Sequence, residues 1–424
     1  MPDISEHIVI VGAGAAGLMA ARELVRAGRR VTILEARERC GGRIHPLPES
    51  EFGYPADAGA EFIHGEAPVT RALLREAGLS LQEIDGTQWN FDGTGLSRED
   101  RHDPHEAQLQ AVLGALKDDL TVTDFLGRYF AAPKYERLRY SIERMVEGYD
   151  AADPARASIL ALREEWMDGG GHHSQARIVG GYGALIEFLA AECRGHGAAI
   201  RFGSVVSAIE EAGNAVVVRC INGEAHACDR VIVTVPLPLL REMALPVAAR
   251  VKAAAADDIG FGSVIKILLR FARPWWRERR PDIADMTFLL SDQTIPVWWT
   301  RYPDSHPVLT GWLGGPRTAK LSHLNSQGLI DAGLDSLATI FDLPRTEVAR
   351  ELVVAAATNW AHDTFARGAY SWATPRTREA QTVLARAEGN VLLSGEALYR
   401  GRDMGTVEAA LASGLATAEM MLRG

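Results

Sequence analysis

A glycine-rich turn between two apolar runs near the N-terminus constrains the fold of this chain more than any other feature. The run Ile8–Val11 predicts a buried strand, residues 12–17 read GAGAAG, and a helix is expected from there to about Ala27. A second apolar run, Val31–Leu34, predicts another strand and ends at Glu35. This order and length are typical of the βαβ unit that binds dinucleotides.

Each glycine of the turn has a physical task. We expect Gly12 to make the tight turn, Gly14 to let the backbone approach a pyrophosphate, and Gly17 to let helix and strand pack closely. Ala15 and Ala16 follow Gly14 at the start of the helix, where unpaired N–H groups and the helix dipole favour an anion. The turn therefore predicts a nucleotide site.

The residues after the second strand indicate which nucleotide cofactor is expected. Glu35, followed by Ala36, lies where a ribose hydroxyl would be expected. Next comes the loop Gly41-Gly42-Arg43, which suits a second close pass of the backbone at phosphate and which an NAD dehydrogenase does not need. The run resembles the signature of the flavin amine oxidase superfamily, which binds FAD. That superfamily includes monoamine oxidases, polyamine oxidases, lysine-specific histone demethylases and bacterial relatives.

The resemblance covers most of the chain and is weakest from residue 66 to 165. It implies an α/β fold of mixed α+β character, with a Rossmann-like FAD-binding domain interleaved with a substrate-binding domain of mixed sheet plus helices. We expect the discontinuous FAD-binding domain to comprise residues 1–70, 176–250 and 388–424, and the substrate-binding domain to comprise 71–175 and 251–387. The segment from about 70 to 165 is polar and is expected to be helical.

Apolar and alternating runs predict further elements of the cofactor domain. Strands are expected over Ala199–Ile209, Ala215–Cys220, Arg230–Val235 and Asn390–Ser394. Helices are expected over 184–194 and Thr406–Arg423.

Composition excludes several other classes of protein. No apolar run approaches the roughly 18–20 residues that span a bilayer, and we expect neither a secretory leader nor a hydrophobic C-terminal anchor. The net charge of −10 argues against nucleic acid as a ligand. Four cysteines show no metal spacing and no disulfide framework, which fits a reducing cytoplasm. We therefore expect a cytoplasmic protein without membrane or nucleic-acid partners; a homodimer, common among relatives, stays open.

The segment from Asp57 to Gly65 contains a second set of expected flavin contacts. It resembles the family strand D-x-G-A-x-aromatic-x-x-G, which passes the flavin ring. The resemblance implies cofactor contacts from Gly59, Ala60, Glu61 and Phe62, and substrate contact from Phe62. It also places Val206 where the family has a valine that contacts adenine.

Lys266 interrupts an apolar, β-branched run, where a lysine is costly to bury without a partner. The usual explanation would be an edge strand with the lysine directed to solvent. The run 260–276, however, resembles the family segment G-x-x-x-K-V/I-x-L-x-F…W. In that family the lysine holds a water beside flavin N5, and the resemblance implies this role in oxygen handling and proton movement for Lys266.

The loop 359–370 resembles the family pattern W-x-x-D-P-Y-x-x-G-x-Y. The resemblance implies that Trp360 contacts the cofactor and that Tyr370 forms one wall of the aromatic cage around the substrate amine. Tyr370 and Lys266 are thus the expected catalytic residues. Ala369 stands where mitochondrial monoamine oxidases carry the cysteine that bonds FAD, so we expect non-covalent FAD.

The C-terminal segment is similar to the family end F-A-G-E…G-T-V-x-G-A-x-x-S-G. Expected cofactor contacts there are Gly395, Glu396, Gly405, Thr406 and Val407, with Glu396 at the ribityl or pyrophosphate region. Thr406, also an expected substrate contact, replaces a second cage tyrosine, which would leave the cage open on one side. Glu408 would either cap the start of this terminal helix or contact substrate, with an ordinary first-turn acid as the default.

These features favour an FAD-dependent amine oxidase. A neutral amine would lose hydride from its α-carbon to flavin N5, the imine would be hydrolysed to a carbonyl compound, and O2 would be reduced to H2O2. Two alternatives are an L-amino-acid oxidase and an oxygen-independent flavin desaturase of the same fold. A chromatin demethylase module is disfavoured because the chain lacks the helical tower insertion.

The L-amino-acid oxidase would need a carboxylate partner. Such enzymes commonly carry an arginine where this chain has Phe62, and Glu61 would repel a carboxylate. Arg301 or Arg317 would have to substitute. The class of amine stays open between primary amines, polyamines and cyclic secondary amines. Polyamines would need carboxylates such as Glu143, Glu147, Glu164 and Glu165, and some of the seven tryptophans between 275 and 372 should line the pocket.

Overall fold

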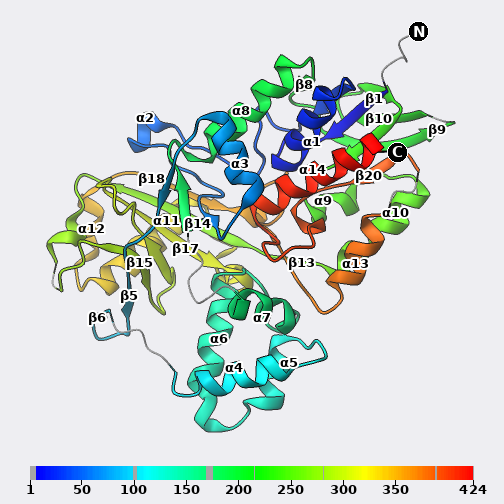
Figure 1. Cartoon of the computed structure of the whole chain (residues 1–424). Coiled ribbons are helices and arrows are strands. Elements are labelled where there is room, and N and C mark those ends of the chain that lie inside the picture. The colour runs from blue at the N-terminus through cyan, green and yellow to red at the C-terminus, as the bar shows by residue number, and fades with distance from the viewer. Residues whose placement is uncertain are drawn as a thin grey trace.

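The computed structural model describes residues 6–98, 103–168, 175–213, 215–279, 281–386 and 389–423. It is a mixed α/β structure in which a parallel sheet and a larger mixed sheet lie side by side, with a helical lobe below them (Figure 1). Within the described ranges, no helix is long and apolar enough to cross a membrane.

Three distant parts of the chain build the five-stranded parallel sheet. Its order is β20-β12-β1-β2-β8, and every neighbouring pair is parallel. The strands are β1 (His7–Val11), β2 (Arg30–Leu34), β8 (Ala199–Arg201), β12 (Arg230–Val233) and β20 (Val391–Leu393). The predicted βαβ unit is confirmed, since α1 (Ala15–Arg26) connects β1 to β2.

The prediction of one continuous strand over Ala199–Ile209 was wrong. The strand β8 ends at Arg201, and the chain turns at Gly203, whose φ of 62° is in the left-handed region that glycine tolerates. The chain then enters a different, antiparallel sheet, ordered β11-β10-β9. Its strands are β9 (Val206–Ala212), β10 (Ala215–Cys220) and β11 (Ala225–Cys228).

Helices cover both faces of the parallel sheet. On one face α1 packs against α8 (Gly181–Gly195) and α14 (Val407–Arg423), and any side chain at Gly414 would overlap the carbonyl of Ala16. The opposite face is covered by the antiparallel sheet and by three short helices. These are α9 (Leu237–Glu242), α10 (Val247–Ala253) and α13 (Thr377–Leu384). The apolar strands are therefore buried on both faces, as parallel sheets require.

The second large sheet has seven strands in the order β18-β14-β17-β16-β15-β5-β6. All neighbours are antiparallel except β15 and β5. The strands are β5 (Thr87–Phe91), β6 (Leu96–Ser97), β14 (Val264–Phe271), β15 (Met286–Leu290), β16 (Val297–Trp299), β17 (Val308–Gly314) and β18 (Leu352–Asn359). Side chains of α11 (Ser326–Ile340) and α12 (Arg345–Arg350) pack into the core of this sheet.

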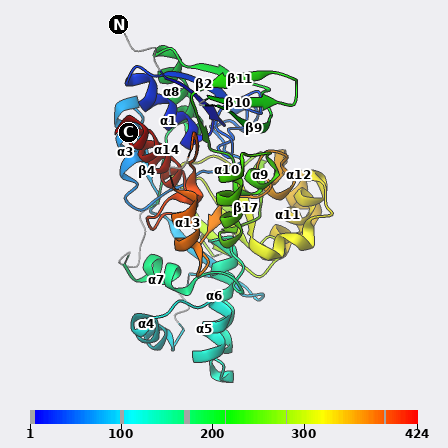
Figure 2. The same cartoon turned by 90° about the vertical axis from the view of Figure 1, so that its right-hand side faces the viewer.

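The segment expected to be helical from about 70 to 165 is only partly so. Its helices α4 (Glu106–Ala115), α5 (Val122–Tyr129), α6 (Glu136–Gly148) and α7 (Ile159–Asp168) form the helical lobe, which extends away from both sheets (Figure 2). Residues 81–97 instead form β4 (Leu81–Glu83), β5 and β6. Pairing with distant strands decides this, because β4 pairs with β7 (Gln175–Ile178) and β5 with β15.

The remaining elements are short. They are α2 (Glu49–Phe52), α3 (Pro68–Ala77) and the strands β3 (Ile63–His64), β13 (Gly260–Phe261) and β19 (Ser371–Trp372). Single 3-10 turns occur at Pro133–Tyr135, Ala254–Asp258, Trp275–Glu278, Gly315–Leu321, Trp360–His362 and Glu396–Leu398.

The two domain ranges given above remain our proposal, and packing across their borders refines it. Leu73 and Leu74 of α3 pack into the same core as α1 and α8. Ala380 and Leu384 of α13 pack into the core on the other face of the parallel sheet. We therefore propose that both helices fold with the cofactor domain, although α3 extends beyond the predicted range 1–70 and α13 lies just before the range 388–424.

Glu408 in the first turn of α14 caps a different helix. Its carboxylate accepts hydrogen bonds from the backbone N–H groups of Val69 (2.9 Å) and Thr70 (2.7 Å) and from the Thr70 hydroxyl (2.7 Å). These N–H groups lie at the start of α3 and have no partner within that helix. Glu408 is the first-turn acid of α14 that was expected by default, but it caps α3 and not the start of its own helix, and it thereby ties α3 to α14.

Replacing Glu408 by alanine should therefore destabilise the protein. We expect a loss of about 2–3 kcal/mol, because three buried donors lose a charged acceptor. Glu419→Ala on the same helix is the matched control, since its exposed pair with Arg423 should contribute at most about 0.5 kcal/mol. Thermal unfolding of both variants checks this, and equal melting temperatures would contradict the cap.

Candidate active site

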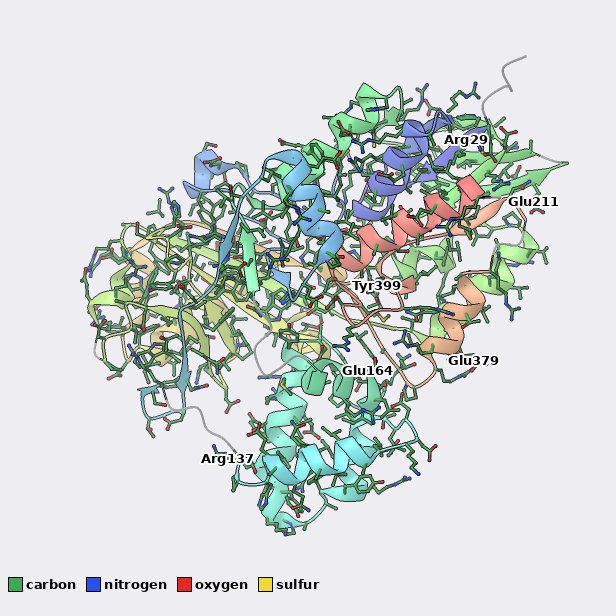
Figure 3. The ribbon with its side chains drawn as sticks, in the orientation of Figure 1. Arg29, Arg137, Glu164, Glu211, Glu379 and Tyr399 are labelled. Carbon is green, nitrogen blue, oxygen red and sulfur yellow. The ribbon has the colours of Figure 1, made fainter. Side chains whose placement is uncertain are left out.

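A single continuous cavity of about 2300 Å³ connects the parallel sheet, the seven-stranded sheet and the helical lobe. Figure 3 marks three of its lining residues, with Tyr399 beside α14 and with Glu164 and Arg137 in the helical lobe. Of the site residues predicted from the sequence, all but Gly17 line this cavity. The structure thus brings together residues from the first, middle and last parts of the chain.

The glycine-rich turn has the shape expected of a phosphate cradle. Gly12 has a φ of 107°, and a Cβ there would lie 2.7 Å from the Thr234 hydroxyl. A Cβ on Gly17 would overlap the carbonyl of Gly12, so Gly17 serves helix–strand packing and not the cavity wall. At Gly14 a Cβ would meet only the Gly41 carbonyl, at 4.0 Å, and no side chain caps α1 there. The cavity can therefore approach the N-terminus of α1 closely.

Glu35 holds the turn from the end of β2. Its carboxylate accepts hydrogen bonds from the backbone N–H of Ala13 (2.7 Å) and of Arg37 (2.9 Å). Burial raises the pKa of this carboxyl, and the two N–H donors oppose the rise. Each oxygen uses one lone pair in these bonds, so lone pairs remain for hydroxyl groups of a ligand. This is the acceptor that a ribose would need.

The Gly41-Gly42-Arg43 loop lies directly beside that turn. Gly41 N–H donates to the Ala13 carbonyl at 2.9 Å, and Arg43 donates to the Ala369 carbonyl (2.7 Å) and to Glu396 (2.8 Å). The hydroxyl of Ser371 also donates to Glu396. Glu396, expected at the ribityl or pyrophosphate region, thus fixes Arg43 and lines the cavity from a buried position.

The start of α14 forms another part of the wall. A Cβ at Gly405 would lie 2.6 Å from the Ser371 carbonyl, so this turn requires glycine. Thr406, expected to contact substrate, uses its hydroxyl as the helix cap: it donates to the Asp403 carbonyl (2.6 Å) and accepts from the Ala409 N–H (3.1 Å). The first turn of α14, with Val407, therefore presents backbone to the cavity.

Two further residues that were predicted to contact the cofactor, Trp360 and Val206, also line the cavity. Trp360 is buried, and its indole N–H donates to the Ala58 carbonyl at 3.1 Å, which places the ring beside Gly59. Val206 lines the cavity from the start of β9.

Lys266 lies on the central strand β14 and not on a sheet edge. Its cross-strand neighbours are Trp312 on β17 and Thr358 on β18, so the edge-strand explanation was wrong. The side chain is 1% exposed, and its ammonium donates to the Gly59 carbonyl (3.0 Å) and to Glu61 Oε2 (2.9 Å). Lys266 therefore reaches the cavity wall as half of a buried ion pair.

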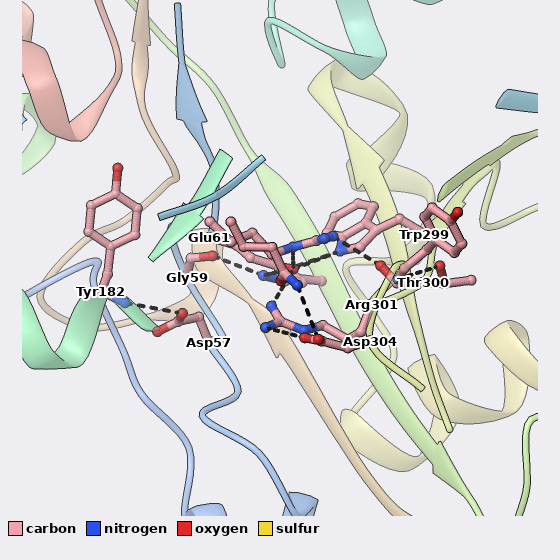
Figure 4. Close-up of polar contacts among 12 residues, drawn as sticks. Asp57, Gly59, Glu61, Tyr182, Trp299, Thr300, Arg301 and Asp304 are labelled. Carbon is pink, nitrogen blue, oxygen red and sulfur yellow. Dashed lines mark hydrogen bonds and ion pairs between the residues drawn. The ribbon is translucent and has the colours of Figure 1, made fainter. Parts of the chain in front are cut away.

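Glu61 is the centre of a cluster of charges (Figure 4). Besides Lys266, its carboxylate accepts from Arg177 Nε (2.9 Å) and from the Trp299 indole N–H (3.1 and 3.2 Å), with Arg301 at 3.7 Å. Burial alone would raise the pKa of Glu61, but Lys266, Arg177 and Arg301 lower it to about 2. The carboxylate is therefore ionised, and its oxygens are engaged by protein groups.

Beyond Glu61, an arc of aromatic rings lines the cavity. Phe62 contacts Trp299 and Phe288, with ring centroids 5.3 and 5.9 Å away, and Trp299 contacts Trp312 at 5.8 Å. Trp312 stacks on Tyr370 at 6.4 Å with an interplanar angle of 19°. The Tyr370 hydroxyl donates to the Tyr149 carbonyl at 2.6 Å, which fixes the ring. An aromatic chamber is thus built at the Lys266 end of the cavity.

The structure answers which tryptophans line the cavity. Trp299, Trp312, Trp360 and Trp372 do, whereas Trp275, Trp276 and Trp298 pack in the core of the seven-stranded sheet.

Sequence reasoning missed His64 and Tyr149, which line the same cavity and lie 3.2 Å apart (Tyr149 hydroxyl to His64 Nδ1). His64 had a signal, because it follows Phe62 by two residues and strand side chains alternate faces.

Only some of the acidic residues considered for polyamine binding line the cavity. Glu147 and Glu164 line the cavity, paired with Arg144 and with Arg378 (3.5 Å), whereas Glu143 is not among the lining residues. The side chain of Glu165 lies outside the described residues. Of the arginines considered for a carboxylate, Arg317 lines the cavity and Arg301 contacts Glu61 and Asp304.

Comparison with known proteins places this geometry in context. A family model described as flavin containing amine oxidoreductase matches residues 15–422. Probable polyamine oxidase 4 of Arabidopsis thaliana is 26% identical over 93% of this chain and 83% of its own length. Human lysine-specific histone demethylase 2 is 28% identical over 93% of this chain but only 51% of its own length.

Solved structures share the fold. A putrescine oxidase bound to putrescine superposes with a TM-score of 0.82 at 18% identity, covering all of both chains. The cyclohexylamine oxidase from Brevibacterium oxydans gives a TM-score of 0.80 at 20% identity, covering 99% of each chain.

Replacing Glu35 by alanine should weaken cofactor binding. We expect an affinity for FAD lower by about 10- to 100-fold, because the turn loses an acceptor that organises it and a bound ribose would lose a hydrogen-bond acceptor. Flavin absorbance relative to protein absorbance, and titration of the apoprotein with FAD, measure this. Glu38→Ala in the same loop is the control, since Glu38 is exposed and does not line the cavity. Equal affinities in the two variants would refute the role of Glu35.

Proposed function

The chain belongs to the flavin-containing amine oxidoreductase family, and from this premise we propose that it is an FAD-dependent oxidase that converts an amine C–N bond to an imine. The imine would be hydrolysed to a carbonyl compound, with O2 reduced to H2O2. The observation that supports this most is the meeting of a buried ammonium, Lys266, with an aromatic chamber in the same cavity that the glycine-rich turn and Glu35 line. The names of the similar proteins, which act on polyamines, putrescine or cyclohexylamine, favour an amine.

The residues present fit FAD. The turn at Gly14 admits a pyrophosphate at the N-terminus of α1, Glu35 offers acceptors to a ribose, and the glycine turn before α14 brings backbone to the far wall. Bound FAD would supply the redox chemistry, taking hydride from the amine α-carbon at N5 and passing the electrons to O2. We propose that FAD is not covalently bound, because Ala369 offers no nucleophile at the position used by mitochondrial monoamine oxidases.

The aromatic chamber would bind and orient the amine. Faces of Tyr370 and Trp312 can accommodate a polarised or cationic nitrogen, and Phe62, Phe288 and Trp299 can pack against its carbon substituent. Because the Tyr370 hydroxyl is held by the Tyr149 carbonyl, the ring is already in place before substrate arrives. An apolar wall of this kind also excludes water from the reacting carbon.

Lys266 would act at the cavity wall through its ammonium. An ammonium has three N–H donors, and two are used by Gly59 and Glu61 in the described part of the chain. The third can hold a water, or move a proton, at Nζ. We propose this as the catalytic role of Lys266, with Tyr370 as the residue that positions the amine.

An L-amino-acid substrate is the second candidate, but no observation favours it. It would need a cation free to pair with a carboxylate, whereas Arg177 and Arg301 are engaged by Glu61 and by other acceptors. Arg317 lines the cavity and is the residue to examine if amino acids prove to be substrates. A cytoplasmic location is also proposed, supported by four free cysteines among the described residues.

Anaerobic reduction of the bound flavin tests the substrate class. We expect primary amines, polyamines or cyclic secondary amines to bleach the flavin absorbance, and L-amino acids to leave it unchanged, because the chamber is aromatic and its nearby arginines are engaged. Stopped-flow spectroscopy with each class separately gives the measurement. Bleaching by amino acids alone would overturn the proposal, and bleaching by no compound would favour the oxygen-independent desaturase.

Replacing Lys266 by methionine tests the proposed catalytic role. We expect the variant to keep FAD but to be reoxidised by O2, or to turn over, more slowly by roughly 10²- to 10⁴-fold, because the only buried ammonium at this wall is removed. Lys320→Met on the exposed end of the turn 315–321 is the control. Turnover of Lys266→Met at the rate of the unaltered protein would refute the assignment.

A further inference from the structure

We propose that Glu61 is a positioning residue of the oxidase reaction: its carboxylate holds the Lys266 ammonium at the cavity wall and keeps it charged. The inference rests on the function proposed above for Lys266 and extends it to the group that controls Lys266. The observation behind it is the direct, buried ion pair of 2.9 Å between Lys266 Nζ and Glu61 Oε2.

Burial makes a partner necessary. Lys266 is 1% exposed on a strand with hydrogen-bonded neighbours on both sides, so bulk water cannot solvate its ammonium. The two protein acceptors at Nζ are the Gly59 carbonyl and Glu61, and only Glu61 carries a negative charge. An isolated buried ammonium tends to lose its proton, whereas a contacting carboxylate favours the charged form.

Glu61 is itself fixed and ionised. Arg177 Nε at 2.9 Å and the Trp299 indole N–H hold its oxygens, and the neighbouring cations keep its pKa near 2 despite burial. The segment carrying it also packs tightly, since a Cβ at Gly59 would overlap the Arg43 carbonyl. The carboxylate is therefore ionised at neutral pH and held by several protein donors.

The groups around the pair do not substitute for Glu61. From β17 and β18 the neighbours of Lys266 are Trp312 and Thr358, which carry no charge. From β7 comes Arg177, and from the end of β16 comes Arg301, both cations that would repel the ammonium if Glu61 were neutral.

The two other acids near the cluster act elsewhere. Asp57 caps α8 through the Tyr182 N–H at 3.4 Å, and burial raises its pKa to about 7. Asp304 contacts Arg301 at 3.6 Å and is not among the residues that contact Lys266. Beyond Arg301 lies the Tyr54 ring, 4.9 Å away, which burial keeps un-ionised. In Figure 4 Asp57 lies with Tyr182, on the side of Gly59 away from Trp299.

Glu61→Gln tests the inference because it keeps the shape of the side chain and removes its charge. The holoenzyme, after reduction by a substrate amine or by dithionite, is mixed with O2, and reoxidation is followed from pH 6 to pH 9.5. The unaltered protein should show a nearly flat profile. At pH 6 the reoxidation rate of Glu61→Gln should be within about 3-fold of that of the unaltered protein. At higher pH this rate should fall by about tenfold per pH unit, once Lys266 of the variant loses its proton.

Matched variants separate charge from structure. Asp304→Asn removes one of the two other acids near the cluster, the one that contacts Arg301, and should keep the flat profile. In Lys266→Met, reoxidation should be slow and its rate should not change with pH. The double variant, which combines Glu61→Gln with Lys266→Met, should be reoxidised no more slowly than Lys266→Met alone, because Glu61 acts through Lys266. If Glu61→Gln does not accumulate as folded flavoprotein, Glu61→Asp replaces it. Glu61→Asp keeps the negative charge but places it farther from Lys266 Nζ. Its reoxidation rate should therefore be lower than that of the unaltered protein at every pH and should not change with pH.

A direct measurement of the lysine uses the composition of the chain. It contains five lysines, at positions 117, 134, 252, 266 and 320. Selective 13Cε-lysine labelling therefore gives few NMR signals, and the signal lost in Lys266→Met is that of Lys266. We expect this signal to change with pH in Glu61→Gln and to be the same in Asp304→Asn as in the unaltered protein.

Two results would overturn the inference in distinguishable ways. If Lys266 keeps its charge in Glu61→Gln and the reoxidation profile stays flat, Glu61 does not control Lys266. If Lys266 titrates in Glu61→Gln while reoxidation stays flat, and Lys266→Met is also reoxidised normally, the function proposed for Lys266 itself fails.

Discussion

The buried ion pair between Lys266 and Glu61 joins the two halves of the site. Glu61 follows the cofactor loop at the start of the chain, and Lys266 lies 205 residues later on a central strand of the seven-stranded sheet. Removing one partner of such a pair leaves an uncompensated buried charge, whereas the intact pair contributes little net stability. The pair is thus better understood as a device for placing an ammonium at the cavity wall than as a source of folding free energy. The aromatic chamber then adjoins that ammonium because Trp299 bonds to the same carboxylate.

Carboxylates organise the rest of the protein in a similar way. Glu35 holds the phosphate turn, Glu396 holds Arg43, Glu408 caps α3, and Asp57 caps α8. Glu396, Glu408 and Asp57 accept from groups far away in sequence, whereas the donors to Glu35 belong to Ala13 and Arg37; all four acids are buried. A buried carboxylate must have its hydrogen bonds satisfied, so these acids fix loops that would otherwise be free to move.

The family resemblance and local patterns predicted much of this. The βαβ unit, the terminal helix and the position of Lys266 on a strand follow from periodicity and glycine spacing, which depend on neighbours in sequence. The expectation of a helical segment from 70 to 165 failed at β5, because pairing with β15, about 200 residues away, decides that strand. The continuous strand 199–209 failed at Gly203 for the same reason: two different sheets receive its two halves.

The sequence by itself determined the nucleotide turn, because that turn rests on steric rules that act over a few residues. The fold class and most of the predicted cavity residues followed from the resemblance of its motifs to those of a known family. Only the tertiary structure decided what each polar side chain does. Glu61 was expected at the cofactor, and its carboxylate pairs with Lys266; Thr406 was expected at the substrate, and its hydroxyl caps α14. Glu408 caps a helix other than its own. Partners of buried charges are chosen by which distant segments the fold brings within about 3 Å, and no local pattern contains that information.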